Sequence, residues 1–259
     1  MIQFYTPGSQ SGFTLVELAI VLMIIGLLIG GILRGQELMN NARISSTIQQ
    51  VKAYQGATVT FLDAYSASPG DLPTAMARLP GCTADNFCVN GDGNGILGIT
   101  NGTVAMQTGN AATRVETSMF WKHLALTHLI SGITPSANPA NPEWGETHPA
   151  AKLRGGFHAL NLAGTLSTRV VQSGLFLRLQ TALTGSSPFS GATCSTSPCP
   201  STEAVSAKEA YQIDTKMDDG LPEGGSVYAD DQGGGAVACE WAYDPRVEGA
   251  ACIMYFRIS

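Results

Sequence analysis

The feature that most constrains this chain is an unbroken apolar run near its N-terminus, from Phe13 to Leu33. The run reads FTLVELAIVLMIIGLLIGGIL, and Thr14 and Glu17 are its polar members. At a rise of about 1.5 Å per residue, a helix of this length is about 31 Å long, which matches the hydrocarbon core of a bilayer. The run therefore predicts a membrane-spanning helix.

Two other interpretations of the run are weaker. A buried core helix would need apolar partners on every side, and the rest of the chain offers little comparable apolar sequence. A secretory signal peptide begins with basic residues and ends in a small-residue cleavage site. Here no Lys or Arg precedes Arg34, and the run ends in GGILRGQ.

Glu17 is the one ionisable residue inside the run. An ionised carboxylate in lipid costs on the order of a few kcal/mol unless it is paired, so Glu17 is a candidate functional residue that needs a cation. An α-amino group at Phe13 would supply one if the chain were cut after Gly12. On one helix that amine points poorly at a side chain four residues on, so we expect the amine of a neighbouring copy to pair with Glu17.

Gly12 followed by FTLVE and a long apolar helix resembles the cleavage and methylation signal of type IV prepilins and type II secretion pseudopilins. The resemblance implies that a membrane aspartyl peptidase, the prepilin peptidase, removes residues 1–12 as a leader and methylates the new amine of Phe13. It also makes Glu17 the glutamate through which subunits assemble.

The resemblance further implies where the protein lies. We expect a single-pass protein of the bacterial inner membrane with its head in the periplasm. It would later join copies of itself or other pilins in a helical filament, periplasmic or extracellular, with the help of inner-membrane assembly machinery.

The helical pattern continues beyond Leu33 but becomes amphipathic, with apolar residues three or four apart up to Tyr65. Ser68-Pro69-Gly70 ends it, because proline removes a helical hydrogen bond. The sequence thus divides into a leader (1–12), a membrane and assembly half of one long helix (13–33), its amphipathic half (34–67) and an extracytoplasmic head (68–259). The predicted fold class is α+β and pilin-like, with the helix packed on a disulfide-tied head that contains a small antiparallel β-sheet.

Secondary structure in the head is predicted element by element. A capping box at Thr113 and Glu116 starts a short helix that ends at Gly132. A surface loop rich in Pro, Asn and Gly follows. The remaining elements are strands or a helix within 164–179, a short helix over 203–217, and strands over 226–229, 236–243 and 252–258.

The six cysteines form three pairs close in sequence, which favours disulfides in an oxidising compartment. We expect neighbours to pair because short loops close most readily, with free buried thiols as the alternative. Zinc is disfavoured, since the sequence has no CxxC motif. The expected pairs are Cys82 with Cys88, Cys194 with Cys199, and Cys239 with Cys252.

Two segments carry oxygen ligands that suit calcium. The loop from Asn90 to Gly95 alternates Asp or Asn with Gly, so Asp92 and Asn94 are candidate ligands, although a plain glycine-rich turn explains the pattern as well. Resemblance to major pseudopilins, which hold calcium near the C-terminus, makes Asp214, Asp218 and Asp219 the second candidate set, with a solvated acidic turn as the alternative. A structural calcium ion is possible here, and no cofactor is required.

Charge and motifs exclude several function classes. With 14 basic against 20 acidic residues and no basic stripe, nucleic acid is not expected as the primary partner. No catalytic grouping or nucleotide loop is recognisable, so the chain is not expected to be an enzyme. We expect a filament subunit, either a pilin or a pseudopilin. The alternative is a membrane-tethered extracytoplasmic enzyme or ligand-binding domain.

Overall fold

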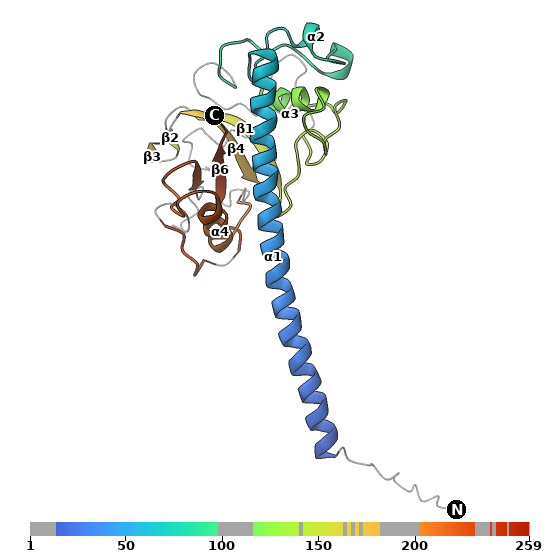
Figure 1. Ribbon diagram of the computed structural model, residues 1–259, viewed down its shortest axis with the longest axis vertical. Helices are drawn as coiled ribbons and strands as arrows, with labels where there is room; N and C mark the ends of the chain where they lie inside the picture. The colour runs from blue at the N-terminus through green and yellow to red at the C-terminus, as the bar shows by residue number, and fades with distance from the viewer. Residues whose placement is uncertain are drawn as a thin grey trace, which may run out of the picture. The chain divides into compact units, whose positions relative to one another are not determined.

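The computed structural model describes residues 14–97, 116–139, 142–162, 165–166, 169–170, 173–181, 203–230, 239, 242–247 and 249–258. The chain divides into two compact units, Met1–Ala42 and Arg43–Ser259. The fold is α+β and pilin-like, as the sequence predicts, with a long N-terminal helix and a small antiparallel sheet (Figure 1). The head also contains disulfides.

Helix α1 (Leu15–Tyr65) begins in the first unit and ends in the second, and its part beyond Arg43 packs in the core of the head. The ring of Tyr54 meets Trp121 and Phe157 edge to face, with centroids 5.1 and 5.4 Å away. The buried side chains of α1 recur every three or four residues, which is the spacing of one helical face. They are Ile44, Thr47, Ile48, Val51, Tyr54, Ala57, Thr58 and Phe61.

Two glutamines fasten α1 to the rest of the head by polar contacts. Gln50 donates from Nε2 to the carbonyl oxygen of Ala150 (3.0 Å) and accepts from the backbone nitrogen of Lys152 (3.1 Å). Gln55 donates from Nε2 to the carbonyl oxygen of Arg257 (2.8 Å). These bonds join residues far apart in sequence, so they fix the helix against two separate backbone segments.

The end of α1 is the one that the sequence predicts. Ser66 has a positive φ of 56°, and the turn before Pro69 follows. Arg78 then closes the helix end: its Nη1 donates to the carbonyl oxygen of Tyr65 (2.9 Å), one of the last carbonyls that a helix leaves unpaired. Its guanidinium also lies over the Tyr65 ring, 5.1 Å from the centroid.

The main sheet has four antiparallel strands in the order β1-β4-β6-β5. Figure 1 labels β1, β4 and β6 of this sheet. Because side chains alternate along a strand, one face joins the core with α1 through residues such as Phe157, Leu177 and Phe256, while the other carries a second cluster that includes Leu160 and Phe176. The strands are β1 (Gly156–Leu162), β4 (Gly174–Gln180), β5 (Val227–Asp230) and β6 (Ile253–Arg257), and β2 (Thr165–Leu166) pairs with β3 (Arg169–Val170) separately.

The described part of the head also contains the 3-10 turn η1 (Ala84–Asn86) and the helices α2 (Ala75–Arg78), α3 (Glu116–Leu126) and α4 (Ala207–Met217). Helix α3 ends six residues before the predicted stop at Gly132, and His128 two residues later has φ 58°. Helix α4 starts later than predicted, because residues 204 and 205 bond to the backbone of Cys252 and Ser206 caps the helix.

The strand predictions are confirmed in part. Strands β5 and β6 lie within one residue of the predicted segments, and β4 occupies the end of the ambiguous stretch 164–179. Strand β1 was not predicted; its first residue was assigned to the loop before it. Most of the predicted strand 236–243 lies outside the described residues, and residues 242 and 243 at its end are not in a strand.

The head contains the disulfides Cys82–Cys88 and Cys239–Cys252. Their four cysteines are buried. The expected pair Cys194 and Cys199 lies outside the described residues. Next to the second disulfide, Val205 forms a bridge with Cys252, which joins the start of α4 to the start of β6.

Candidate functional site

The start of α1 is closed by a capping box built from Thr14 and Glu17. Thr14 Oγ1 accepts from the backbone nitrogen of Glu17 (3.2 Å), and Glu17 Oε2 accepts from the backbone nitrogen of Thr14 (2.9 Å). The Thr14 hydroxyl also donates to Glu17 Oε2 (2.9 Å). Two of the amide groups that a helix leaves unpaired at its start are thus satisfied.

This arrangement gives Glu17 a local role that the sequence analysis missed. The signal was present, because Thr14 and Glu17 have the S/T-x-x-E spacing of a capping box. Both hydrogen bonds that the carboxylate accepts from described residues end on Oε2. The other oxygen, Oε1, is therefore open to a further donor.

The helix that follows exposes an apolar surface all round. Every described residue from Thr14 to Arg34 is exposed, and Leu15 reaches 87%. The segment is long and apolar enough to cross a membrane. A soluble monomer rarely leaves so large an apolar surface in water, so a lipid or protein partner is needed.

Residues 8–33 match the family model of the prokaryotic N-terminal methylation motif. The chain therefore carries a prepilin-type signal. No curated protein and no solved structure matches the chain.

Within the prepilin-type signal, Glu17 lies in the first turn of α1. Gly12 and Phe13, the predicted cleavage and methylation positions, lie outside the described residues. The described part of the signal thus consists of the capped helix start and the exposed apolar helix.

The second predicted site, at the end of α4, brings three carboxylates together. Oxygen atoms of Asp214, Asp218 and Asp219 lie within 4.8 Å of one another. Asp214 is fully buried and accepts from the Tyr243 hydroxyl (2.7 Å) and the Gly220 backbone nitrogen (3.3 Å). Burial raises the pKa of Asp214 to about 6, and the neighbouring charges of Asp219 and Asp218 add to the rise.

The other two carboxylates of this group are partly engaged. Asp218 Oδ2 accepts from the backbone nitrogens of Ser226 and Val227 at the start of β5. Asp219 Oδ1 accepts from the backbone nitrogen of Leu221 (2.9 Å). A cation would relieve the repulsion among the three side chains, and carboxylate oxygens are ligands that calcium prefers.

The third predicted site, at Asp92 and Asn94, is a closely hydrogen-bonded loop. Asn94 Oδ1 accepts from the backbone nitrogen of Ile96 (2.7 Å), and Asn94 Nδ2 donates to Asp92 Oδ2 (2.8 Å). The buried Asp71 carboxylate, which the sequence analysis did not single out, accepts from the backbone nitrogens of Gly93, Asn94 and Gly95. The loop is thus held in shape by its own side chains and by Asp71, and calcium at this loop stays a prediction.

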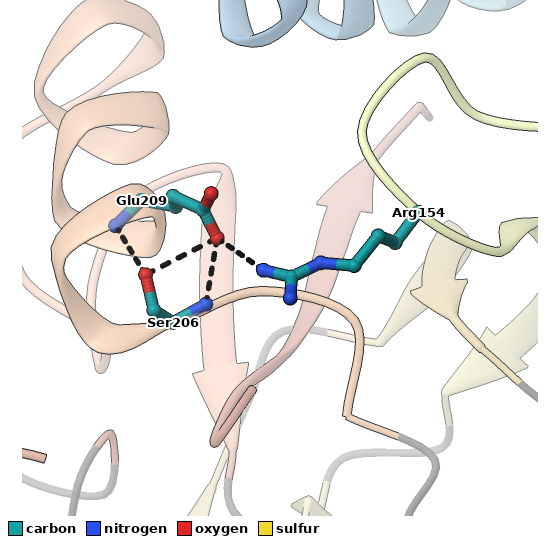
Figure 2. A network of polar contacts seen from close by, with 3 residues as sticks. All are labelled: Arg154, Ser206 and Glu209. Atoms are coloured by element: carbon teal, nitrogen blue, oxygen red, sulfur yellow. Dashed lines mark hydrogen bonds and ion pairs between the residues drawn. The ribbon is translucent and has the colours of Figure 1, made fainter. Parts of the chain in front are cut away.

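Two further polar arrangements in the head were not predicted. Figure 2 shows the first: Glu209 Oε2 accepts from the Ser206 backbone nitrogen (2.9 Å) and hydroxyl (3.1 Å) and pairs with Arg154 Nη2 (2.6 Å). The capping box of α4 is thereby tied to the segment before β1. In the second, Lys122 of α3 donates to the carbonyl oxygens of Asn86, Pro135 and Ala137. Both arrangements join distant segments, which sequence spacing does not reveal.

Proposed function

We propose that this chain is a structural subunit, a pilin or a pseudopilin, of a type IV pilus-like or type II secretion filament. The observation that carries the proposal is the prepilin-type signal at residues 8–33, which includes Glu17 and the exposed apolar part of α1. An apolar helix of this kind is stable in lipid before assembly and among sister helices afterwards, because both surroundings are apolar.

Processing supplies the cation that Glu17 lacks. In the proposal, prepilin peptidase cuts between Gly12 and Phe13 and methylates the new amine, which stays basic and is cationic near neutral pH. The Glu17 carboxylate of one subunit pairs with the amine of another as their helices slide together. The Thr14 cap supports this role, because it holds the carboxylate through Oε2 and leaves Oε1 for the incoming amine.

The proposal also assigns location and partners. Before assembly the subunit is stored in the bacterial inner membrane, with the head in the periplasm. Inner-membrane machinery then inserts it into a filament of its own copies or of related pilins. The final filament is periplasmic or extracellular.

The test is a set of Glu17 variants read out in two ways. Glu17→Ala removes both the charge and the cap, whereas Glu17→Gln removes the charge and keeps an oxygen acceptor for Thr14. The mass of the mature N-terminus reports processing, and sedimented filaments seen by electron microscopy report assembly. We expect normal processing and a large loss of filaments for both variants.

Glu37→Gln is the matched control. Glu37 lies beyond the apolar run on the same helix, is exposed and pairs with Arg34 (3.2 Å), so its loss should leave filament yield unchanged. If Glu17→Gln assembles normally while Glu17→Ala does not, the carboxylate acts as a cap and not as the charge partner. Unchanged filament yield in both Glu17 variants would refute any assembly role for this residue.

The alternative, a membrane-tethered enzyme or ligand-binding domain, predicts different outcomes for the unmodified chain. A tethered domain makes no filaments and gains no methylated N-terminus. A mature chain that begins with N-methylated Phe13 supports the filament subunit. A native chain that retains residues 1–12 contradicts it.

A structural calcium ion at Asp214, Asp218 and Asp219 is a second part of the proposal. Their shared repulsion and the full burial of Asp214 support it. We expect calcium, and magnesium less, to raise the melting temperature of the wild type. The effect should disappear in Asp218→Asn/Asp219→Asn and persist in Asp85→Asn, an exposed control. An equal calcium effect in the double variant would rule out this site.

A further inference from the structure

A short segment before β1, residues 142–150, is held on the edge of the main sheet by a few polar contacts; we name it the His148 strap. Trp144 Nε1 donates to the carbonyl oxygen of Thr181 (2.8 Å). The carbonyl oxygen of Pro149 accepts from the backbone nitrogen of Phe157 (3.0 Å), and that of Ala150 accepts from Gln50 Nε2 (3.0 Å). The strap contains no helix or strand of its own, so these contacts and its packing hold it in place.

The strap packs on the sheet through an imidazole pair. His148 stacks on His158 of β1 with ring centroids 5.6 Å apart and an interplanar angle of 18°. Both residues are 1% exposed, and neither Nε2 atom has a hydrogen-bond partner among the described residues. His148 Nδ1 lies 2.9 Å from the Thr147 hydroxyl. Two neutral imidazoles fit this place, whereas an imidazolium would lose its water, and no hydrogen bond among the described residues joins a carboxylate to either ring.

The charged groups on this face of the sheet include Arg178 of β4 and, two strands further on, the buried carboxylate of Asp230 in β5. Arg178 of β4 lies directly opposite His158 in the β1–β4 register, is 1% exposed and is permanently charged. Its guanidinium lies over the ring of Tyr255, 5.7 Å from the centroid, and the edge of Trp144 meets His148. The strap's own carboxylates, Glu143 and Glu146, are exposed, and no hydrogen bond joins either to an imidazole among the described residues.

We propose that the His148 strap is an acid-released flap: protonation of the stacked His148 and His158 pair beside Arg178 detaches residues 142–150 from the sheet while the rest of the head stays folded. Release exposes both imidazoles to water and uncovers a basic pair, His158 and Arg178. The head thus contains a pH-sensitive device that does not depend on the filament role.

The sign of the effect follows from the two protonation states. Burial lowers the pKa of His148 to about 3, and burial together with the charges of His148 and Arg178 lowers the pKa of His158. In the released strap the His148 imidazole regains an ordinary pKa of about 6.5 and binds a proton below it, whereas His158 regains water but keeps Arg178 beside it on the sheet, so its pKa recovers less. Acid therefore favours release: from pH 7 to pH 5 the opening equilibrium rises about 25-fold through His148, and His158 multiplies this rise by a smaller factor.

Amide hydrogen exchange on the full chain in detergent micelles tests this. After correction for intrinsic exchange rates, the Phe157 amide, which bonds from β1 to the carbonyl oxygen of Pro149 in the strap, should lose more than about 25-fold protection between pH 7 and pH 5. Amides in β4 and β6 should lose much less. Equal losses at Phe157 and in β4 and β6 would mean global unfolding and would overturn the proposal.

Variants assign the effect to the pair. His148→Phe and His158→Phe keep an aromatic ring and cannot titrate. His158→Phe should show only the change of about 25-fold that His148 supplies, and His148→Phe should show only the smaller change that His158 supplies. His128→Asn is the control, because His128 is exposed and its positive φ of 58° suits asparagine; it should behave as the wild type. A full wild-type response in either Phe variant refutes the inference.

The wild type alone provides a second test should a Phe variant fail to fold. The imidazole C2 proton resonances of His148 and His158 should not titrate with midpoints near 6.5 in the closed state. Midpoints near 6.5 for both, with the strap amides still protected, would overturn the proposal.

Discussion

The hydrogen bonds of the buried Lys122 ammonium predict how much this residue stabilises the head. Its side chain is 4% exposed, and its ammonium donates to the carbonyl oxygens of Asn86 (2.7 Å), Pro135 (2.7 Å) and Ala137 (2.9 Å). All three donors of the ammonium are thereby used. Helix α3 is thus tied to the loop that the Cys82–Cys88 disulfide closes and to the loop before the His148 strap.

Replacing Lys122 by Met keeps most of the side-chain volume and removes the donors. Each carbonyl that loses its partner costs about 1 kcal/mol, so the three together predict a loss of about 3 kcal/mol in the free energy of unfolding. Burial lowers the pKa of Lys122 to about 8, because the buried ammonium has lost water. Methionine carries no charge, so the absence of this desolvation cost offsets part of the loss in unfolding free energy. We expect a net destabilisation of about 2–3 kcal/mol.

Urea unfolding of the full chain in micelles, with its disulfides intact and followed by tryptophan fluorescence, measures this change. Trp121, in the same helix, is fully buried and reports directly on the region. The control is Lys208→Met on α4, because Lys208 is exposed and its loss should stay within about 0.5 kcal/mol of the wild type. If Lys122→Met also unfolds within that margin, the three bonds do not stabilise the head.

Two further predictions concern His123 and the Glu209 network. Burial lowers the pKa of His123 to about 4, and its Nδ1 accepts from the Gly70 nitrogen (2.9 Å); the stability of the head should therefore fall as the pH drops from about 6.5 towards 4. His123→Gln should remove about 2 kcal/mol of the loss in unfolding free energy between pH 7 and pH 5, measured by urea unfolding at each pH. An unchanged pH dependence of this free energy would contradict the prediction. In a double-mutant cycle, Arg154→Ala and Glu209→Ala should show a coupling of about 0.5–1 kcal/mol, because the pair is partly exposed, and additive unfolding energies would contradict the coupling.

Features that depend on local sequence were predictable. The long helix and its end before Pro69 follow from apolar periodicity and from proline chemistry, and both are observed. The same holds for β6, whose apolar alternation is visible in the sequence. In each case the decisive interaction lies within a few residues of the chain.

Features that depend on distant partners were not predictable. Strand β1 has a His and an Asn among its apolar residues, and only pairing with β4 and packing beneath the strap make it a strand. Helix α3 stops at Leu126 although the apolar pattern continues. No sequence pattern indicated the stack of His148 on His158 or the bonds of Lys122.

The buried and the exposed apolar side chains of α1 occupy different stretches of the helix. All of the buried side chains lie between Ile44 and Phe61, where they pack in the core of the head, whereas the residues from Leu15 to Leu33 are exposed. The stability of the head therefore depends on the stretch from Ile44 to Phe61, which includes Gln50 and Gln55. The stretch from Leu15 to Leu33 needs lipid or sister helices around it. Substitutions at Glu17 should accordingly change assembly without changing the unfolding of the head, and substitutions at Lys122 should do the reverse.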